Sequence, residues 1–262
     1  MEIVIAFFMF LIGTFLGSFF TLAIHRLPLK QNITHERSYC PNCNHKLGFF
    51  DLFPIFSYLF LGGKCRYCGK KIARKYLYIE LASGIVFLLF YLSFQMDWMW
   101  IEIDKLVALF FGIIFISTLI LIAGIDQEKH EIQKNVIVVG LCISLCYILY
   151  LSIIEQISID RYAIYLGLLL LFVLMDTLYL KRKGKSNYTI QILMLCMYLM
   201  LGVTPRIFVL AVIITFLCVA IKTSVLKFQK EKVENTMVPF GFYLCISSIV
   251  LMIIQNFLIY SI

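Results

Sequence analysis

Long apolar runs separated by short polar segments dominate this chain of 262 residues. A helix needs about 20 apolar residues to cross the hydrocarbon core of a membrane. Eight runs approach this length, at residues 3–24, 78–96, 105–125, 136–154, 162–180, 188–204, 206–226 and 240–260. The pattern therefore predicts an all-α polytopic membrane protein with about eight transmembrane helices.

The one polar segment long enough to form a module lies between the first two apolar runs. We therefore expect a first transmembrane helix over residues 1–24, a loop over residues 25–77 and a membrane core of seven helices over residues 78–262. A loop of roughly fifty residues is too small for a stable hydrophobic core unless a metal ion or a similar cross-link supports it.

The composition agrees with a membrane protein, since 62% of the residues are hydrophobic and 15% are charged. Soluble domains carry about a quarter charged residues. The net charge of +8 could indicate a nucleic-acid partner, but the basic residues follow the alternation of the apolar runs. Of the 23 lysines and arginines, all but Lys105, Arg161 and Arg206 lie on or beside one set of alternating loops.

This distribution predicts the orientation of the chain in the membrane. Basic loops stay in the cytoplasm, so we expect the loop 25–77 to be cytoplasmic and both termini to lie outside. The orientation accounts for the net charge without nucleic acid, and we expect no nucleic-acid partner. Contact between the basic loops and anionic lipid headgroups is expected instead.

Four cysteines in the loop form two CxxC pairs, Cys40 with Cys43 and Cys65 with Cys68. Each pair can present two thiolates from one tight turn, and two pairs complete a tetrahedral zinc shell. Four thiolates leave no open position, so the predicted zinc site is structural. The alternative is a pair of disulfides or four unrelated thiols, but the reducing cytoplasm favours zinc.

Between the two CxxC pairs lies an aromatic and apolar stretch, residues 49–58. It can pack on the predicted four-cysteine zinc site, here called the zinc knuckle, or lie at the membrane surface. Packing on the knuckle is the preferred interpretation.

Three carboxylates, Glu80, Asp126 and Asp176, lie inside or at the ends of predicted helices, toward the cytoplasmic side. Charged groups within membrane spans are costly and often functional. Each has a structural alternative. Asp126 can be a solvated loop acid, Asp176 can pair with the basic cluster 181–183, and Glu80 suits the N-terminal dipole of its helix.

Several short motifs follow one another along the chain: Gly17-Ser18-Phe19 with Ile24-His25-Arg26-Leu27-Pro28, the four-cysteine loop, Tyr76 and Glu80-Leu81 with Gly84, Asp126, and Val238-Pro239-Phe240-Gly241. In this order they resemble the motifs of the prepilin leader peptidase family. Thr21 stands where the family has Asn in the first motif.

The resemblance implies a bifunctional enzyme of the bacterial inner membrane. Such enzymes cleave the leader of type IV prepilins or type II secretion pseudopilins at the cytoplasmic face, then methylate the new N-terminus from S-adenosylmethionine. It also implies a membrane aspartic protease in which two carboxyl groups share one proton: one activates water while the other polarises the scissile carbonyl. Asp126 corresponds to the first of these aspartates.

The second aspartate of the family lies in a GxGD motif, which here reads Gly184-Lys185-Ser186-Asn187. An amide can neither act as the ionised base nor share the proton. Asn187 can be an engineered isostere or a natural divergence, or Asp176 can supply the second carboxyl from the neighbouring helix. Divergence is preferred, because Ser186 and Gln133 depart from the family as well.

Two main functions remain open. The first is an active prepilin peptidase and N-methyltransferase, and the alternative is a catalytically impaired relative that binds pilin-like signal helices without cleaving them. A zinc-knuckle membrane scaffold unrelated to pilins is disfavoured, because it does not explain the order of the motifs.

Overall fold

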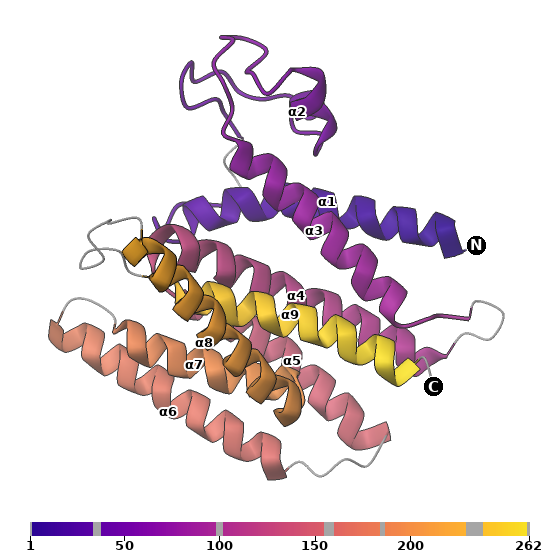
Figure 1. The fold of residues 1–262 in the computed structure, drawn as a ribbon, viewed down its shortest axis with the longest axis vertical. Helices are drawn as coiled ribbons and strands as arrows, with labels where there is room; N and C mark the ends of the chain where they lie inside the picture. The colour runs from indigo at the N-terminus through magenta and orange to yellow at the C-terminus, as the bar shows by residue number, and fades with distance from the viewer. Residues whose placement is uncertain are drawn as a thin grey trace. The chain divides into compact units, whose positions relative to one another are not determined.

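A computed structural model describes residues 2–33, 38–97, 102–154, 160–183, 187–228 and 238–260 (Figure 1). Within these residues the chain is almost entirely helical, with two isolated β-bridges and no β-strand. The long helices are α1 (Glu2–Arg26), α3 (Arg74–Ser93), α4 (Ile103–Lys129), α5 (Lys134–Ile154), α6 (Asp160–Lys183), α7 (Tyr188–Gly202), α8 (Pro205–Phe228) and α9 (Phe240–Tyr260). Two short helices, η1 (Phe49–Asp51) and α2 (Phe56–Phe60), lie in the first loop.

Every apolar run of the sequence forms a helix at the expected place. Seven of the described helices are long and apolar enough to cross a membrane, and α7 is apolar but has only 15 residues. The predicted class, an all-α polytopic membrane protein with a cysteine loop between its first two spans, is therefore confirmed.

The chain forms two compact units, Met1–Leu106 and Val107–Ile262. In the first unit α3, which the sequence assigned to the membrane core, packs against α1. The two helices run antiparallel, and small residues bring their backbones together. A Cβ atom on Gly13 would lie 2.7 Å from the Ser83 carbonyl oxygen, and one on Gly17 would lie 2.8 Å from Glu80 Cα. Such close contact between membrane helices requires glycine.

In the second unit the short helix α7 lies at the centre. It contacts α5, α6, α8 and α9. Its residue Tyr198 is completely buried, and the hydroxyl of Tyr198 lies 2.6 Å from that of Thr118 on α4. Contacts with four surrounding helices therefore hold α7 in place.

The close contact between α1 and α3 leads to a stability prediction. Gly13→Ala places a methyl group against the backbone of α3, so we expect the thermal midpoint of the detergent-solubilised protein to fall, with a cost of about 1–3 kcal/mol. Gly167→Ala on α6 is the matched control, because a Cβ atom there meets open space. Thermal melts followed by circular dichroism compare the two. Equal midpoints for both variants would contradict the packing.

Candidate functional site

The four cysteines of the loop lie on two turns of the same geometry. In the first turn the Cys40 N–H donates to the His45 carbonyl at 3.0 Å, and in the second the Cys65 N–H donates to the Lys70 carbonyl at 2.9 Å. A single β-bridge closes each turn, Tyr39 with Lys46 and Lys64 with Lys71. The two turns repeat at an interval of 25 residues, so they present their cysteines in the same way.

The residue after each CxxC pair has a left-handed backbone conformation. Asn44 has φ 54° and Gly69 has φ 68°. Asparagine and glycine are the residues that adopt this region at least cost. From there the N–H groups of Asn44 and Gly69 donate to the carbonyls of Cys40 and Cys65 at 2.8 and 2.9 Å. The sequence thus favours both turns locally.

The two turns bring all four sulfur atoms together. The four Sγ atoms lie within 4.8 Å of one another, and those of Cys40 and Cys68 are 3.9 Å apart. A tetrahedral zinc ion with Zn–S bonds of about 2.3 Å would separate its sulfurs by about 3.8 Å. The cluster can therefore hold a metal ion with little movement.

The electrostatics of the cluster also suit a cation. The backbone N–H of Lys70 and the side chain of Asn42 lower the pKa of Cys68 to about 6. The backbone N–H of His45 favours the Cys43 thiolate, but desolvation and the neighbouring thiols outweigh it and raise the pKa of Cys43 to about 11. Four thiolates at this distance repel one another, so full ionisation requires a positive charge between them.

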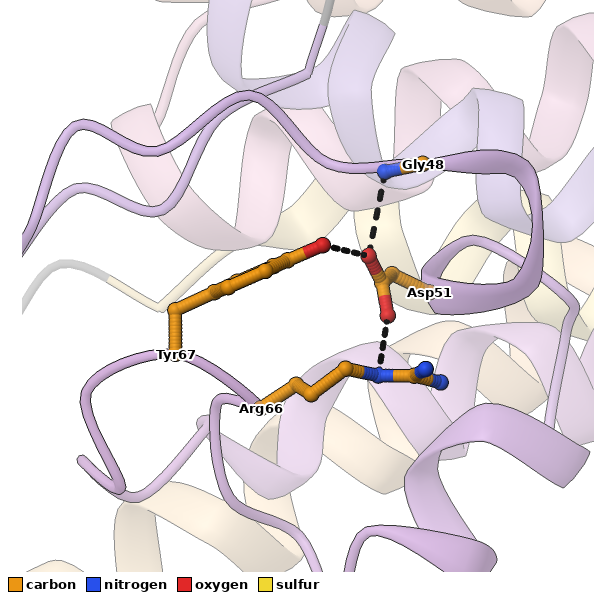
Figure 2. A network of polar contacts seen from close by, with 4 residues as sticks. All are labelled: Gly48, Asp51, Arg66 and Tyr67. Atoms are coloured by element: carbon orange, nitrogen blue, oxygen red, sulfur yellow. Dashed lines mark hydrogen bonds and ion pairs between the residues drawn. The ribbon is translucent and has the colours of Figure 1, made fainter.

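A polar network joins the turn of Cys65 and Cys68 to the stretch between the two CxxC pairs (Figure 2). The carboxylate of Asp51 accepts from the Gly48 N–H and the Tyr67 hydroxyl, each at 3.0 Å, and pairs with Arg66 Nε at 2.8 Å. The bond to Asp51 also raises the pKa of Tyr67. Arg66 and Tyr67 lie inside the second CxxC pair, so this network fixes η1 against the knuckle.

Asp126 lies near the end of α4 and is completely buried. Its Oδ2 accepts from the Phe242 N–H at 2.9 Å and from the Tyr188 hydroxyl at 3.1 Å. The first N–H groups of a helix are unpaired and carry a partial positive charge, and α9 directs them at this carboxylate. Its Oδ1 has no hydrogen-bond partner among the described residues.

Tyr188 connects the carboxylate to α9. Besides donating to Asp126, its hydroxyl accepts from the Phe240 N–H at 3.0 Å. Gly241 permits the approach, because a Cβ atom there would lie 3.0 Å from Asp126 Oδ2. The end of α4 and the beginnings of α7 and α9 therefore meet at one carboxylate.

Asp176, on α6, is also completely buried, but it has a different partner. Its Oδ2 pairs with Lys134 Nζ at 2.9 Å, which joins the start of α5 to α6. The expected structural alternative paired Asp176 with the basic cluster 181–183, whereas the structure pairs it with Lys134.

Asn187 caps the first turn of α7. Its side-chain oxygen accepts from the Thr189 N–H at 3.0 Å, which is the usual action of an asparagine at this position. Asn187 directly precedes Tyr188, so the second family position is adjacent in sequence to the partner of Asp126. The preceding residues 184–186 lie outside the described part of the chain.

Sequence reasoning missed two contributors, Tyr188 and Lys134. Tyr188 could have been noticed because it follows the degenerate GxGD position. Lys134 gave no signal, because a lysine beside a membrane span is ordinary. Gln191 on α7 makes a further contact: it is buried, and its side-chain oxygen accepts from the N–H of Ile132, between α4 and α5, at 3.1 Å.

Fold and site together define a polytopic membrane protein with a four-thiol loop and a buried carboxylate at the basic ends of its helices. Residues 11–94 match the family model described as the bacterial peptidase A24 N-terminal domain. This part of the chain is therefore similar to the N-terminal domain of that peptidase family, in agreement with its motifs.

Relatives named prepilin leader peptidase/N-methyltransferase are similar over about half of the chain. That of Myxococcus xanthus is 35% identical over 136 residues, covering 52% of this chain and 38% of the relative. That of Klebsiella pneumoniae is 36% identical over 129 residues (47% and 53%), and that of Bacillus subtilis is 36% identical over 130 residues (50% and 49%). The chain thus spans about half the length of these relatives or less. No solved structure matches it.

The buried ion pair gives a second stability prediction. Lys134→Met removes this cation from the buried Asp176 carboxylate, so we expect a loss of about 3 kcal/mol. Combining it with Asp176→Leu should restore most of the loss, because no uncompensated charge remains. Lys129→Met, at an exposed lysine on α4, is the control. Thermal melts in detergent measure all four proteins, and a double variant no more stable than Lys134→Met would contradict the pairing.

Proposed function

We propose that this chain is a prepilin leader peptidase and N-methyltransferase of the bacterial inner membrane. Its substrates would be type IV prepilins or type II secretion pseudopilins. The names of its relatives support this class of activity. The single observation that carries the peptidase part is the buried Asp126 carboxylate, with one oxygen held by α9 and Tyr188 and the other without a described partner.

In the proposed aspartic mechanism, Asp126 is the general base. Its buried, unpaired Oδ1 would take a proton from a water molecule that enters with the substrate, while Oδ2 stays fixed by its two donors. Asn187 cannot share a proton, but its amide nitrogen is a donor that can hydrogen-bond to the scissile carbonyl. Such a pair polarises the carbonyl without supplying an acid, so hydrolysis should be slower than with two carboxyl groups. The ion pair with Lys134 disfavours Asp176 as the second carboxyl.

The proposed topology brings a prepilin to this site. With basic loops in the cytoplasm and both termini outside, Asp126 lies at the cytoplasmic edge of the membrane. The hydrophobic stem of a prepilin would lie among the spans, with its leader beside the loops. This arrangement matches an enzyme that cuts where a signal helix leaves the bilayer.

We propose that the four cysteines hold a structural zinc ion. Their donor set and spacing fit zinc, and four thiolates leave no position for water or substrate. The ion would neutralise the mutual repulsion of the thiolates and hold the two turns together.

Zinc analysis tests this assignment. The protein purified without chelators should carry about one zinc ion per chain, and Cys68→Ser should lose most of it because three thiolates bind more weakly. Cys146→Ser, at an exposed cysteine on α5, should leave the content unchanged. Substoichiometric zinc together with disulfides among the four cysteines would overturn the assignment.

A second candidate function is a relative that binds pilin-like signal helices without cleaving them. The observation that favours it is Asn187, whose side-chain oxygen caps α7 at the position where the family has its second aspartate. It predicts capture of a prepilin by the wild-type protein without turnover.

Cleavage of a cognate prepilin in detergent separates the two functions. If the chain is an active enzyme, the wild-type protein cleaves the prepilin and Asp126→Asn does not. The cleavage rate should rise about 10²-fold in Asn187→Asp, the usual range of an acid–base contribution. Asp160→Asn, an exposed acid on α6, is the control for charge removal. Binding without cleavage by the wild type, with turnover appearing in Asn187→Asp, would replace the first function by the second.

The proposed N-methyltransferase activity is supported by the names of the relatives, and S-adenosylmethionine is the proposed methyl donor. It can be tested on the same reaction by mass spectrometry of the mature N-terminus, since methylation adds a defined mass. Unmethylated product in the presence of the donor would remove this half of the proposal.

A further inference from the structure

An aromatic segment of the first unit, residues 49–61, contains η1 and α2. The preferred expectation was that it packs on the four-cysteine site, and two of its residues do contact the second cysteine turn: Asp51 through its network, and Tyr58, whose hydroxyl donates to the Ile72 carbonyl at 3.4 Å. Between these two residues the segment also contacts the helix pair. The Phe53 ring meets the ring of Phe15 on α1 at 5.2 Å between centroids, and the Ile55 N–H donates to Glu80 on α3 at 2.8 Å.

Both contacts are made with the membrane-spanning helices themselves. Phe15 precedes the end of the first apolar run at residue 24 by nine residues, or about 14 Å of helix. Glu80 follows the start of the second run at residue 78 by two residues, or about 3 Å. The aromatic segment therefore reaches past the ends of both runs.

Glu80 has a clear role in this arrangement. Ile55 has φ 62° and ψ −54°, a strained conformation for a β-branched residue. Non-helical backbone is tolerated at membrane depth only where the protein satisfies its N–H groups. The Glu80 carboxylate supplies that acceptor, which accounts for an acid within a span better than a dipole effect does.

The outer surface of the segment is strongly apolar. Phe60 is 86% exposed, Phe50 76% and Leu59 62%. A groove of about 460 Å³ lies among Phe50, Phe53, Phe56 and Phe60, with Arg66 at its rim. Water would make such a surface costly, whereas aromatic rings suit the membrane interface.

The charge around the segment complements anionic lipid. Between residues 38 and 75 the one acid is Asp51, which is bound in its own network. The basic residues there are Lys46, Lys64, Arg66, Lys70, Lys71, Arg74 and Lys75. Each basic group near an anionic surface contributes about 1 kcal/mol of attraction.

We propose that the aromatic segment is a re-entrant lipid-binding wedge. It enters the leaflet on the side of the basic loop, where its rings contact acyl chains and its groove accommodates a chain of an anionic phospholipid. The neighbouring lysines and arginines face the headgroups. The wedge anchors the four-cysteine knuckle to the bilayer, and it is independent of prepilin cleavage.

Tryptophan fluorescence of the full-length protein in lipid nanodiscs tests the depth of the wedge. The two native tryptophans, Trp98 and Trp100, are first replaced by phenylalanine, and Phe60→Trp then adds a single reporter. Tyr39→Trp, on the first cysteine turn, where the native side chain is 51% exposed, is the control. Leu59→Trp is a second reporter on the wedge, in case one substitution impairs folding.

Quenching by lipids brominated in the acyl chain should be several-fold stronger for Phe60→Trp than for Tyr39→Trp, and quenching by aqueous acrylamide several-fold weaker. The lipid quenching should increase when phosphatidylglycerol replaces part of the phosphatidylcholine. Adding Glu80→Leu should expose the tryptophan at position 60 to water and raise its quenching by acrylamide. Glu80→Gln keeps an acceptor for the Ile55 N–H and should leave the quenching unchanged.

Equal acrylamide quenching at both reporter positions would overturn the wedge. Protection of the wedge reporters from both quenchers would also overturn it, because protein rather than lipid would then cover the segment. Lipid quenching that does not respond to phosphatidylglycerol would remove the anionic headgroup from the proposal. None of these readouts depends on whether the protein cleaves a prepilin, so the two proposals fail separately.

Discussion

A carboxylate buried at the end of an apolar helix must be met by donors from other parts of the chain, and Asp126 imposes that constraint on the second unit. Its Oδ2 is held by the first N–H groups of α9 and by Tyr188 at the start of α7. Three helix termini therefore meet at one atom. Burial of an ionisable group without such donors would cost several kcal/mol. The same hydrogen bonds therefore fix the ends of the three helices and orient the Asp126 carboxylate.

The first unit satisfies its buried polar groups by the same principle with different residues. Glu80 accepts from a strained backbone at Ile55, and Asp51 binds three donors around the second knuckle. Four thiols within 4.8 Å of one another require a cation to ionise fully. The carboxylates of Glu80 and Asp51 each join segments that are far apart in the sequence. Polar contacts, rather than apolar packing alone, therefore hold the loop in register with its helices.

The helices could be predicted from the sequence because a membrane span depends on local composition, and all eight apolar runs became helices. The knuckle was equally predictable, since Asn44 and Gly69 favour the two turns that carry the cysteines. Long-range partners were not predictable. Lys134 lies 42 positions from Asp176 and Tyr188 lies 62 from Asp126, and no local pattern indicates such pairs. The exposure of the aromatic stretch also depends on Phe15 and Glu80, which the sequence does not connect to it.

The hydroxyl of Tyr188 and the carboxylate of Asp126 act as one unit in the second half of the chain. A double-mutant cycle measures this most directly, with Asp126→Asn, Tyr188→Phe and the double variant compared with the wild type by reversible unfolding in mixed detergent micelles. Since hydrogen bonds to charged groups contribute about 1.5–3 kcal/mol, the account predicts a coupling free energy of at least about 1 kcal/mol. Effects that add to within about 0.3 kcal/mol would contradict it.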